Sequence, residues 1–365
     1  MKYTQIEYFE WVKNNYPKTK YNLAISGVFP PGNKTISEIT PDISDWHSLP
    51  IGFDGDQQLL KLLSERYQIP QENILTASGA SKANFLAMAA IIEPGDTVIV
   101  ESPNYEPLVR IPQMLGAKVQ FIERLPSNNY EVDLEAINEL MTKNVSLITI
   151  TNLHNPSGVV MSKKELKALC ELVEDNNCHL LSDEVYREFV FDKPPPQAAE
   201  LSERAITTNS LTKVYGLGNL RAGWIMANTK LINKCRKIKF HTSVITSPVT
   251  EKLAYHALLN IDKLIAHSRS VLKKNTPIIK KWIKKQDYFD VKIPKHAAYC
   301  FPKFFNINVT ELSEMLSNYY ETLIVPGKFF GTAEFARIGY GVPTEVLQTG
   351  LENIENAVNA LIKPN

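Results

Sequence analysis

The sequence contains little of what marks metalloproteins, disulfide-bonded proteins, membrane proteins and nucleic-acid-binding proteins. It has four cysteines in 365 residues, no Cys-x-x-Cys pair and no histidine cluster at metal-ligand spacing, so we expect reduced thiols and no metal site. Its longest apolar run, Phe85 to Ile92, is far shorter than a membrane span. With 40 basic and 39 acidic residues, the net charge of +1 gives no global field that attracts nucleic acid or an anionic membrane. Any anion-binding site must therefore be local.

We expect no secretory signal in the first residues of this sequence. Glu7 places an acid where a signal peptide has its apolar core. The hydrophobic fraction of 44% and the charged fraction of 22% are ordinary for a globular protein, and the length suits a large domain plus a smaller one. We expect a cytoplasmic protein.

The middle of the chain alternates between helical and β-rich patterns. The β-rich runs lie at 97–100, 118–121, 146–151 and 179–182, and helical patterns lie between them, as at 82–92 and 163–176. This alternation predicts an α/β domain with a mainly parallel sheet and helices on both faces.

The last third of the chain has a different pattern. Residues 229–285 carry Leu, Ile and Lys at helical spacing, which predicts long helices. We interpret the basic stretch 273–285 as a solvated helix face rather than a nucleic-acid patch, because the overall charge is balanced. A strand-like run at 298–301 and a terminal helix from about Thr344 predict a separate α+β region.

Small residues precede the predicted helix at 82–92. Gly79, Ala80 and Ser81 place unpaired backbone N–H groups at a helix N-terminus, where the helix dipole favours an anion such as a phosphate ester. Ser210 and Arg221 would add a hydroxyl and a guanidinium to the same phosphate. The alternative is a plain helix cap.

Lys213 is the candidate nucleophile. It ends the string Ser-Leu-Thr-Lys that begins at Ser210, and Arg221 follows eight positions later, so the amine has a polar partner and a fixed cation nearby. Ser-x-x-Lys is also the nucleophile signature of penicillin-binding proteins, but the Ser-Asp-Asn and Lys-Thr-Gly strings of those enzymes do not occur here. The pattern favours a lysine that forms an imine with a carbonyl cofactor.

Further polar residues stand where a parallel sheet gathers ligands. Asp183 ends an apolar run, at the carboxyl end of a predicted strand, although capping of a following helix is an alternative. Tyr186 follows it, and Asn155 lies in the turn sequence Asn-Pro-Ser-Gly. Tyr105 and Arg337 are the other candidates; their alternatives are ordinary aromatic packing and a surface position.

In this order the motif residues make the sequence resemble the class I/II aminotransferases, which are fold-type I pyridoxal phosphate enzymes. These residues are Gly79, Tyr105, Asn155, Asp183, Tyr186, Ser210, Lys213, Arg221 and Arg337. The resemblance implies a large domain, residues 40–270, with a mainly parallel seven-stranded sheet sandwiched by helices. A smaller α+β domain would comprise residues 1–39 and 271–365. A homodimer with residues of both subunits at each site is also implied.

The resemblance further implies how pyridoxal 5'-phosphate is bound. Lys213 would form the Schiff base, Asp183 would keep the ring nitrogen protonated and Tyr105 would stack on the ring, and these three are the expected catalytic residues. Tyr186 and Asn155 would donate hydrogen bonds to the phenolate oxygen of the ring. The expected phosphate contacts are Gly79, Ala80, Ser81, Ser210 and Arg221.

The substrate and the reaction follow from the same resemblance. Arg337 would bind the α-carboxylate, with Asn155 and Gly27 as further substrate-binding residues. The expected reaction moves an amino group from an L-amino acid to a 2-oxo acid through pyridoxamine phosphate. A lyase, a decarboxylase or a cyclising synthase would share the first steps and stays open. A non-catalytic regulator would require a DNA-binding domain, for which the chain has no room and no basic segment.

Four further features of the sequence bear on the expected site. Pro50 stands where the family carries a tyrosine that reaches the phosphate across the dimer, and residues 295–298 replace a common glycine pair. His154 is interpreted as a structural histidine. Tyr105 stands where the strictly dicarboxylate-specific members have tryptophan, which favours aromatic or neutral substrate side chains, with aspartate still open.

Overall fold

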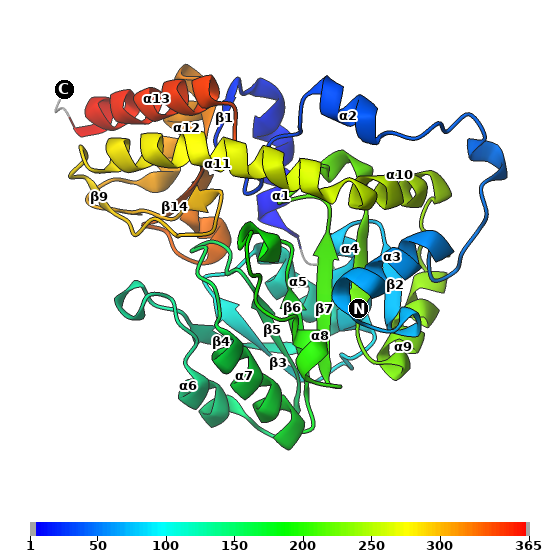
Figure 1. The fold of residues 1–365 in the computed structure, drawn as a ribbon. Coiled ribbons are helices and arrows are strands. Elements are labelled where there is room, and N and C mark those ends of the chain that lie inside the picture. Colours follow the sequence, from blue (N-terminus) through cyan, green and yellow to red (C-terminus); the bar gives the residue numbers. More distant parts are fainter. Residues whose placement is uncertain (1–4, 363–365) are drawn as a thin grey trace.

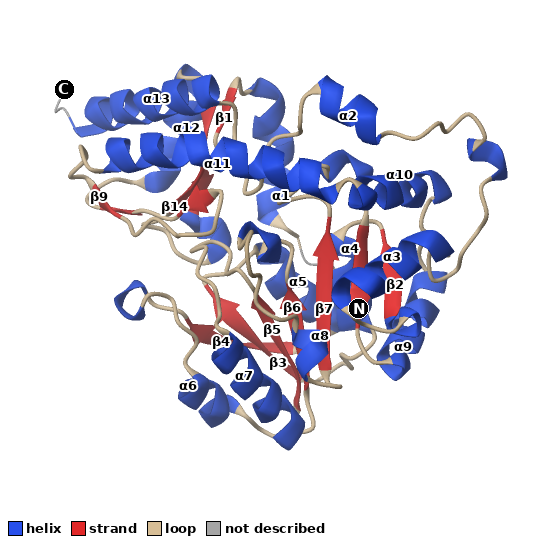
Figure 2. Cartoon of the chain, in the orientation of Figure 1, coloured by secondary structure: helices blue, strands red, loops and turns tan. Residues whose placement is uncertain are grey.

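The computed structural model describes residues 5–362 and is built on a seven-stranded sheet (Figure 2). The strand order is β2-β8-β7-β6-β5-β3-β4. Strand β8 runs antiparallel to both neighbours, and the other pairs are parallel. The strands are β2 (Ile74–Ala77), β3 (Thr97–Ser102), β4 (Lys118–Glu123), β5 (Val145–Thr151), β6 (His179–Asp183), β7 (Ala205–Ser210) and β8 (Gly223–Met226).

Helices cover both faces of this sheet because its central strands are apolar on both sides. Val98 and Val100 pack in one core cluster with α4, α5 and α9, whereas Ile99 packs in another with α6 and α7. The helices are α1 (Glu7–Asn15), α2 (Asn33–Ile39), α3 (Gln57–Tyr67), α4 (Ala80–Ala89), α5 (Glu106–Leu115), α6 (Leu134–Leu140), α7 (Lys163–Asp175), α8 (Ala198–Leu201), α9 (Thr229–Phe240), α10 (Pro248–Leu259), α11 (Ile261–Ile283), α12 (Val309–Tyr319) and α13 (Thr344–Ile362).

The C-terminal part forms a second region, in which α12 and α13 pack beside α11 (Figure 1). Its short strands form a three-stranded sheet, β10-β14-β13, and the pair β11-β9, while β12 pairs with β1 near the N-terminus. The N-terminal segment therefore joins this region. The strands are β1 (Tyr21–Asn22), β9 (Phe289–Asp290), β10 (Tyr299–Cys300), β11 (Lys303–Phe304), β12 (Thr322–Leu323), β13 (Val325–Pro326) and β14 (Ala336–Gly339).

The predicted fold class is confirmed: an α/β protein with a seven-stranded, mainly parallel sheet between helices and a smaller α+β region. The helix predicted at 82–92 begins at Ala80 and ends at Ala89, with Pro94 shortly beyond its end. The predicted domain boundary at 270/271 falls inside the continuous helix α11. Within residues 5–362, no helix is long and apolar enough to span a membrane. The same described residues hold no cluster of three or more His, Cys, Asp or Glu side chains suited to a metal ion.

Candidate active site

A cavity of about 350 Å³ gathers most of the predicted site residues. It lies where β5, β6 and β7 end, which is where parallel sheets bind ligands. Of the twelve predicted residues, Gly27 and Gly79 are not among those that line it. The ten that do are Ala80, Ser81, Tyr105, Asn155, Asp183, Tyr186, Ser210, Lys213, Arg221 and Arg337.

Lys213 lies in the loop after β7, and its amine faces the cavity. The amine donates a hydrogen bond to Ser26 Oγ at 3.2 Å, and the Tyr186 hydroxyl donates to the same oxygen at 2.8 Å. Burial, followed by the charge of Arg337, lowers the pKa of Lys213 to about 8, although Asp183 opposes the change. About a tenth of the amine is therefore uncharged, and nucleophilic, at pH 7.

Gly27 supports the lysine loop from behind rather than lining the cavity. A Cβ at Gly27 would lie 2.5 Å from the carbonyl oxygen of Lys213, so a side chain does not fit there. The next residue, Val28, donates its amide to the same carbonyl at 2.9 Å. The glycine thus allows Ser26 to approach the amine, and a direct contact of Gly27 with substrate stays a prediction.

Asp183 ends β6 as a buried carboxylate. Its Oδ2 accepts a hydrogen bond from Asn84 Nδ2 at 2.7 Å, and Asn84 Oδ1 in turn accepts from Thr208 at 2.6 Å. Burial raises the pKa of Asp183, and the bonds from Asn84 and from the Val185 amide oppose that rise. Asn84 lies on α4, so one helix both supports the carboxylate and begins at the candidate phosphate site.

The N-terminus of α4 forms the candidate phosphate cradle. Gly79, at the N-cap with φ 83°, has no side chain to cap the helix. A Cβ there would lie 2.6 Å from Arg221 Nη2, so only glycine lets the guanidinium lie against this backbone. Arg221 is held by Gly218 and Ser78 carbonyls at 3.3 and 3.5 Å. Ser210, at the end of β7, completes the group.

Arg337, from β14, faces this group from the C-terminal region. Its Nη1 donates to Asn155 Oδ1 and its Nη2 to the Ala24 carbonyl oxygen, both at 2.9 Å. Its Nε is buried and has no hydrogen-bond partner among the described residues. A buried donor without a partner is costly, so Arg337 has spare capacity for an incoming carboxylate.

Sequence reasoning missed several lining residues. Tyr8, Phe9 and Val12 come from α1, and Tyr16 follows that helix. No motif marks them, because an aromatic residue on an amphipathic helix is indistinguishable from core packing until the helix is placed. Asn84 was also missed, although a polar residue in the otherwise apolar run of α4 was a usable signal.

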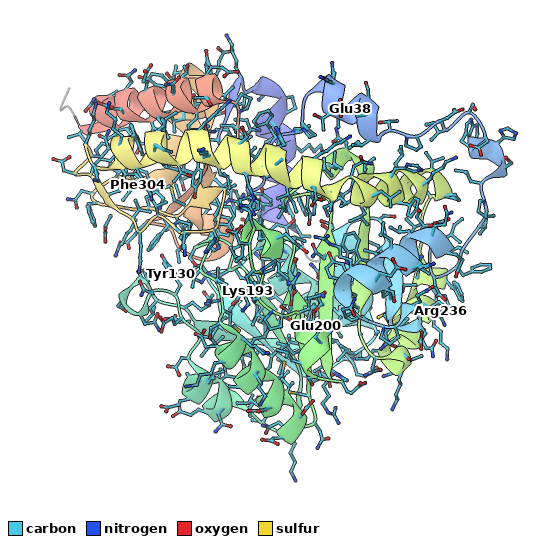
Figure 3. All side chains as sticks on the ribbon, in the orientation of Figure 1. Glu38, Tyr130, Lys193, Glu200, Arg236 and Phe304 are labelled. Carbon is cyan, nitrogen blue, oxygen red and sulfur yellow. The ribbon has the colours of Figure 1, made fainter. Side chains whose placement is uncertain are left out.

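His154 and a larger cleft lie outside this site. The His154 ring is fully buried, with Nδ1 2.6 Å from Ser157 Oγ and Nε2 2.9 Å from the Pro103 carbonyl oxygen, which suits a structural role. A cleft of about 730 Å³ is lined by the 126–131 and 290–296 segments. Tyr130, labelled in Figure 3, belongs to it. None of the twelve predicted residues lines that larger cleft, so the smaller cavity is the candidate active site.

The residues present fit pyridoxal 5'-phosphate. A phosphate suits the α4 N-terminus with Arg221, a pyridine nitrogen suits the Asp183 carboxylate, and an aldehyde suits the Lys213 amine. The three groups come from different strand ends but line one cavity. Their separate chemistries match the three functional parts of a single cofactor.

Known proteins resemble this chain over most of its length. The model of the family "Aminotransferase class I and II" matches residues 43–354. A capreomycidine synthase from Streptomyces vinaceus is 28% identical over 363 residues, covering 94% of this chain and 91% of that protein. A probable aspartate aminotransferase from Methanocaldococcus jannaschii is 28% identical, covering 78% of this chain and 76% of that protein.

The fold also matches a solved structure. A PLP-dependent aminotransferase from Streptococcus suis superposes with a TM-score of 0.92 at 27% identity, covering 100% of both chains. The family match extends from before α3 into α13 and includes both the lysine loop and Arg337. The chain belongs to the class I and II aminotransferase family, and its cofactor is pyridoxal 5'-phosphate.

Proposed function

We propose that this protein is an aminotransferase that moves an amino group from an L-amino acid to a 2-oxo acid. The observation that carries the proposal is the placement of Lys213, with its lowered pKa, in one cavity with Asp183 and Arg337. Pyridoxal phosphate, when bound, supplies the carbonyl that accepts the amino group and a ring that withdraws electrons. The chain supplies binding, orientation and proton transfer.

Arg337 orients the substrate by its α-carboxylate. The free Nε, with one of the two Nη atoms, offers a planar fork to the carboxylate oxygens. Asn155 Oδ1 holds Nη1, which leaves the Asn155 amide NH₂ to donate toward the phenolate oxygen of the cofactor. One arginine serves both the amino acid and the oxo acid, since each carries the same carboxylate.

Lys213 acts as the base. Because burial lowers its pKa to about 8, Nζ exchanges a proton near neutral pH, and it removes the proton from the substrate Cα. Ser26 and Tyr186 position the amine by hydrogen bonds before substrate arrives. Asp183, held by Asn84, keeps a proton on the ring nitrogen through charge pairing.

The proposal includes a homodimer. Exposed apolar side chains lie on two segments that meet where Phe53 packs on Phe240, with ring centroids 5.8 Å apart. Arg236 on α9, labelled in Figure 3, pairs with Asp54 beside them. A second copy that covers this surface would remove the exposure. The exposed apolar residues of the two segments are Trp46, Ile51, Phe53, Phe240 and Val244.

A cyclising synthase is the second candidate function, because the relative that matches 94% of the chain is named a capreomycidine synthase. Both reactions need the same lysine and carboxylate site. They differ in whether the substrate's amino group stays on the cofactor after proton transfer.

Product stoichiometry tests the proposal. Protein loaded with pyridoxal phosphate is mixed with single L-amino acids without any oxo acid, and products are quantified by mass spectrometry. An aminotransferase forms stoichiometric pyridoxamine phosphate and the matching oxo acid, then stops until 2-oxoglutarate is added. Continued turnover to ammonia, carbon dioxide or a cyclic product would contradict the proposal, and the cyclic product would establish the synthase.

A further inference from the structure

The first helix and the residue that follows it line part of the cavity. Tyr8, Phe9 and Val12 of α1, together with Tyr16, are here called the roof. The ring of Tyr8 meets that of Tyr105 edge-on at 6.0 Å, and the Phe9 ring does the same at 6.2 Å. The roof therefore rests on the side chain that is expected to stack on the cofactor.

A single carboxylate fastens α1 to the sheet region. Glu106 Oε2 accepts the Tyr8 amide at 2.7 Å, and Oε1 accepts the Glu7 amide at 3.2 Å. Ile6, at the N-cap, has an apolar side chain that cannot cap the helix, so Glu106 takes that role from 98 residues away in sequence. Arg110 Nε donates to Glu106 Oε1 at 3.0 Å and fixes the carboxylate.

Glu106 directly follows Tyr105 and is the first residue of α5. The two hydrogen bonds from α1 to Glu106 are here called the clasp. Because Glu106 is joined to Tyr105 by one peptide bond, the clasp couples the position of the roof to that of Tyr105. Glu106 is 8% exposed, does not line the cavity of the candidate site, and accepts hydrogen bonds from two backbone amides of α1, so it acts on the site through α1. Glu106 is a positioning residue for the roof.

The charges in the cavity constrain the substrate side chain. Among the described lining residues of this one chain, the cations are Lys213, Arg221 and Arg337, and each already has a function as base, phosphate contact or carboxylate fork, so this chain itself offers a second substrate carboxylate no further cation. Burial raises the pKa of Tyr16, so its hydroxyl stays neutral. It interacts with the side chains of Tyr8 and Asn22. A second substrate carboxylate would meet neutral rings and hydroxyls, at a high desolvation cost.

We propose that the roof, clasped by Glu106, selects an amino donor with an uncharged aromatic side chain. This inference rests on the proposed function, since it names the donor for the same site. An aromatic substrate ring meets the rings of Tyr8, Phe9 and Tyr105, and a phenol or imidazole on the substrate finds the Tyr8 and Tyr16 hydroxyls.

The first test compares donors and unreactive carboxylates on the cofactor-loaded protein. We expect kcat/KM for L-phenylalanine and L-tyrosine to exceed that for L-aspartate and L-glutamate by about tenfold or more. Isothermal titration should show 3-phenylpropionate binding at least about tenfold tighter than succinate. Equal or tighter binding of succinate, or faster conversion of the acidic donors, would overturn the proposal.

The second test breaks the clasp. We expect Glu106→Ala to weaken 3-phenylpropionate binding and raise KM for L-phenylalanine about tenfold, with kcat changed far less, because hydrogen bonds to a charged group are lost. Glu106→Gln, which keeps one acceptor, should recover part of the affinity. Amide hydrogen exchange in residues 7–15 should quicken in the alanine variant. Unchanged affinity together with unchanged exchange would show that Glu106 does not hold the roof.

A matched control lies on the same helix. Glu10 is exposed and pairs only weakly with Lys13, at 3.9 Å, so Glu10→Ala should change affinity by less than about twofold. The two proposals fail separately. An oxo acid formed preferentially from aspartate would refute aromatic selection and leave aminotransfer standing. An aromatic donor converted to ammonia or a cyclic product would refute aminotransfer and leave the selection standing.

Discussion

The floor and the roof of the active site are built by different means. The floor, comprising Asn155, Asp183, Ser210 and Lys213, follows the ends of β5, β6 and β7, where the sheet fixes each position to its neighbours. The roof comes from α1 and from Tyr16 directly after it, and α1 is held by backbone hydrogen bonds to the Glu106 carboxylate and by the contact of the Tyr8 ring with the Tyr105 ring. The comparison teaches that the reacting groups follow strand ends of one sheet, whereas the proposed substrate selection depends on a helix held to the sheet region by a carboxylate distant in sequence.

The largest effect is expected at the floor. Lys213→Ala removes both the amine that binds the cofactor carbonyl and the base, so kcat should fall by about 10³-fold or more. The phosphate cradle at α4 is untouched, so the variant should still bind pyridoxal phosphate, as equilibrium dialysis would show. Wild-type turnover by this variant would contradict the roles assigned to Lys213.

The next effect lies where floor and roof meet. Arg337→Lys keeps a positive charge but loses the planar fork, so KM for every donor should rise by about 10- to 100-fold. Steady-state kinetics with an aromatic and an acidic donor would check this. A rise in KM confined to one donor class would show that Arg337 binds the substrate side chain rather than the α-carboxylate. Substrate selection would then not belong to the roof alone.

The pH dependence of cofactor uptake sharpens the account of Lys213. Its pKa of about 8 predicts that the initial rate of uptake by cofactor-free protein rises about tenfold per pH unit below pH 8 and levels off above it. Because the folded pKa is lowered, the charged amine destabilises the fold at pH below about 8, and this cost is relieved as pH rises from about 8 towards 10.5. Stopped-flow absorbance would measure the uptake. A flat profile between pH 6 and 8 would contradict the lowered pKa.

The contrast between floor and roof also explains which site residues could be predicted from the sequence. Asp183 and Lys213 are predictable because each follows a strand or turn signal, and strand ends of a parallel sheet gather in space. Gly79 is predictable for a local reason, since it begins a helix. Tyr8 and Tyr16 are not, because their role arises only when α1 is clasped by a residue 98 positions away. Gly27 was predicted as a substrate contact, but the structure gives it another function. A side chain at this position would collide with the Lys213 carbonyl oxygen, so the glycine makes room for the lysine loop.

Some predictions stay untested by the fold. The domain division at 39/40 and 270/271 is one, since α11 crosses the second boundary as a continuous helix. The cytoplasmic location also stays a prediction. Pro50 is exposed on the apolar segment that ends at Phe53, and its ring has no hydroxyl for the phosphate contact that the resembled family makes across the dimer from this position.

The most direct measurement is to locate the cofactor on the chain. Within residues 5–362, Lys213 and Lys239 both have a pKa lowered to about 8, so a lowered pKa alone does not choose between them. Lys239 donates to the Phe53 carbonyl oxygen at 3.1 Å and does not line the cavity. Borohydride reduction of the cofactor-loaded protein, followed by peptide mass spectrometry, should place the pyridoxyl group on Lys213. A label on Lys239, or on no lysine, would contradict the account.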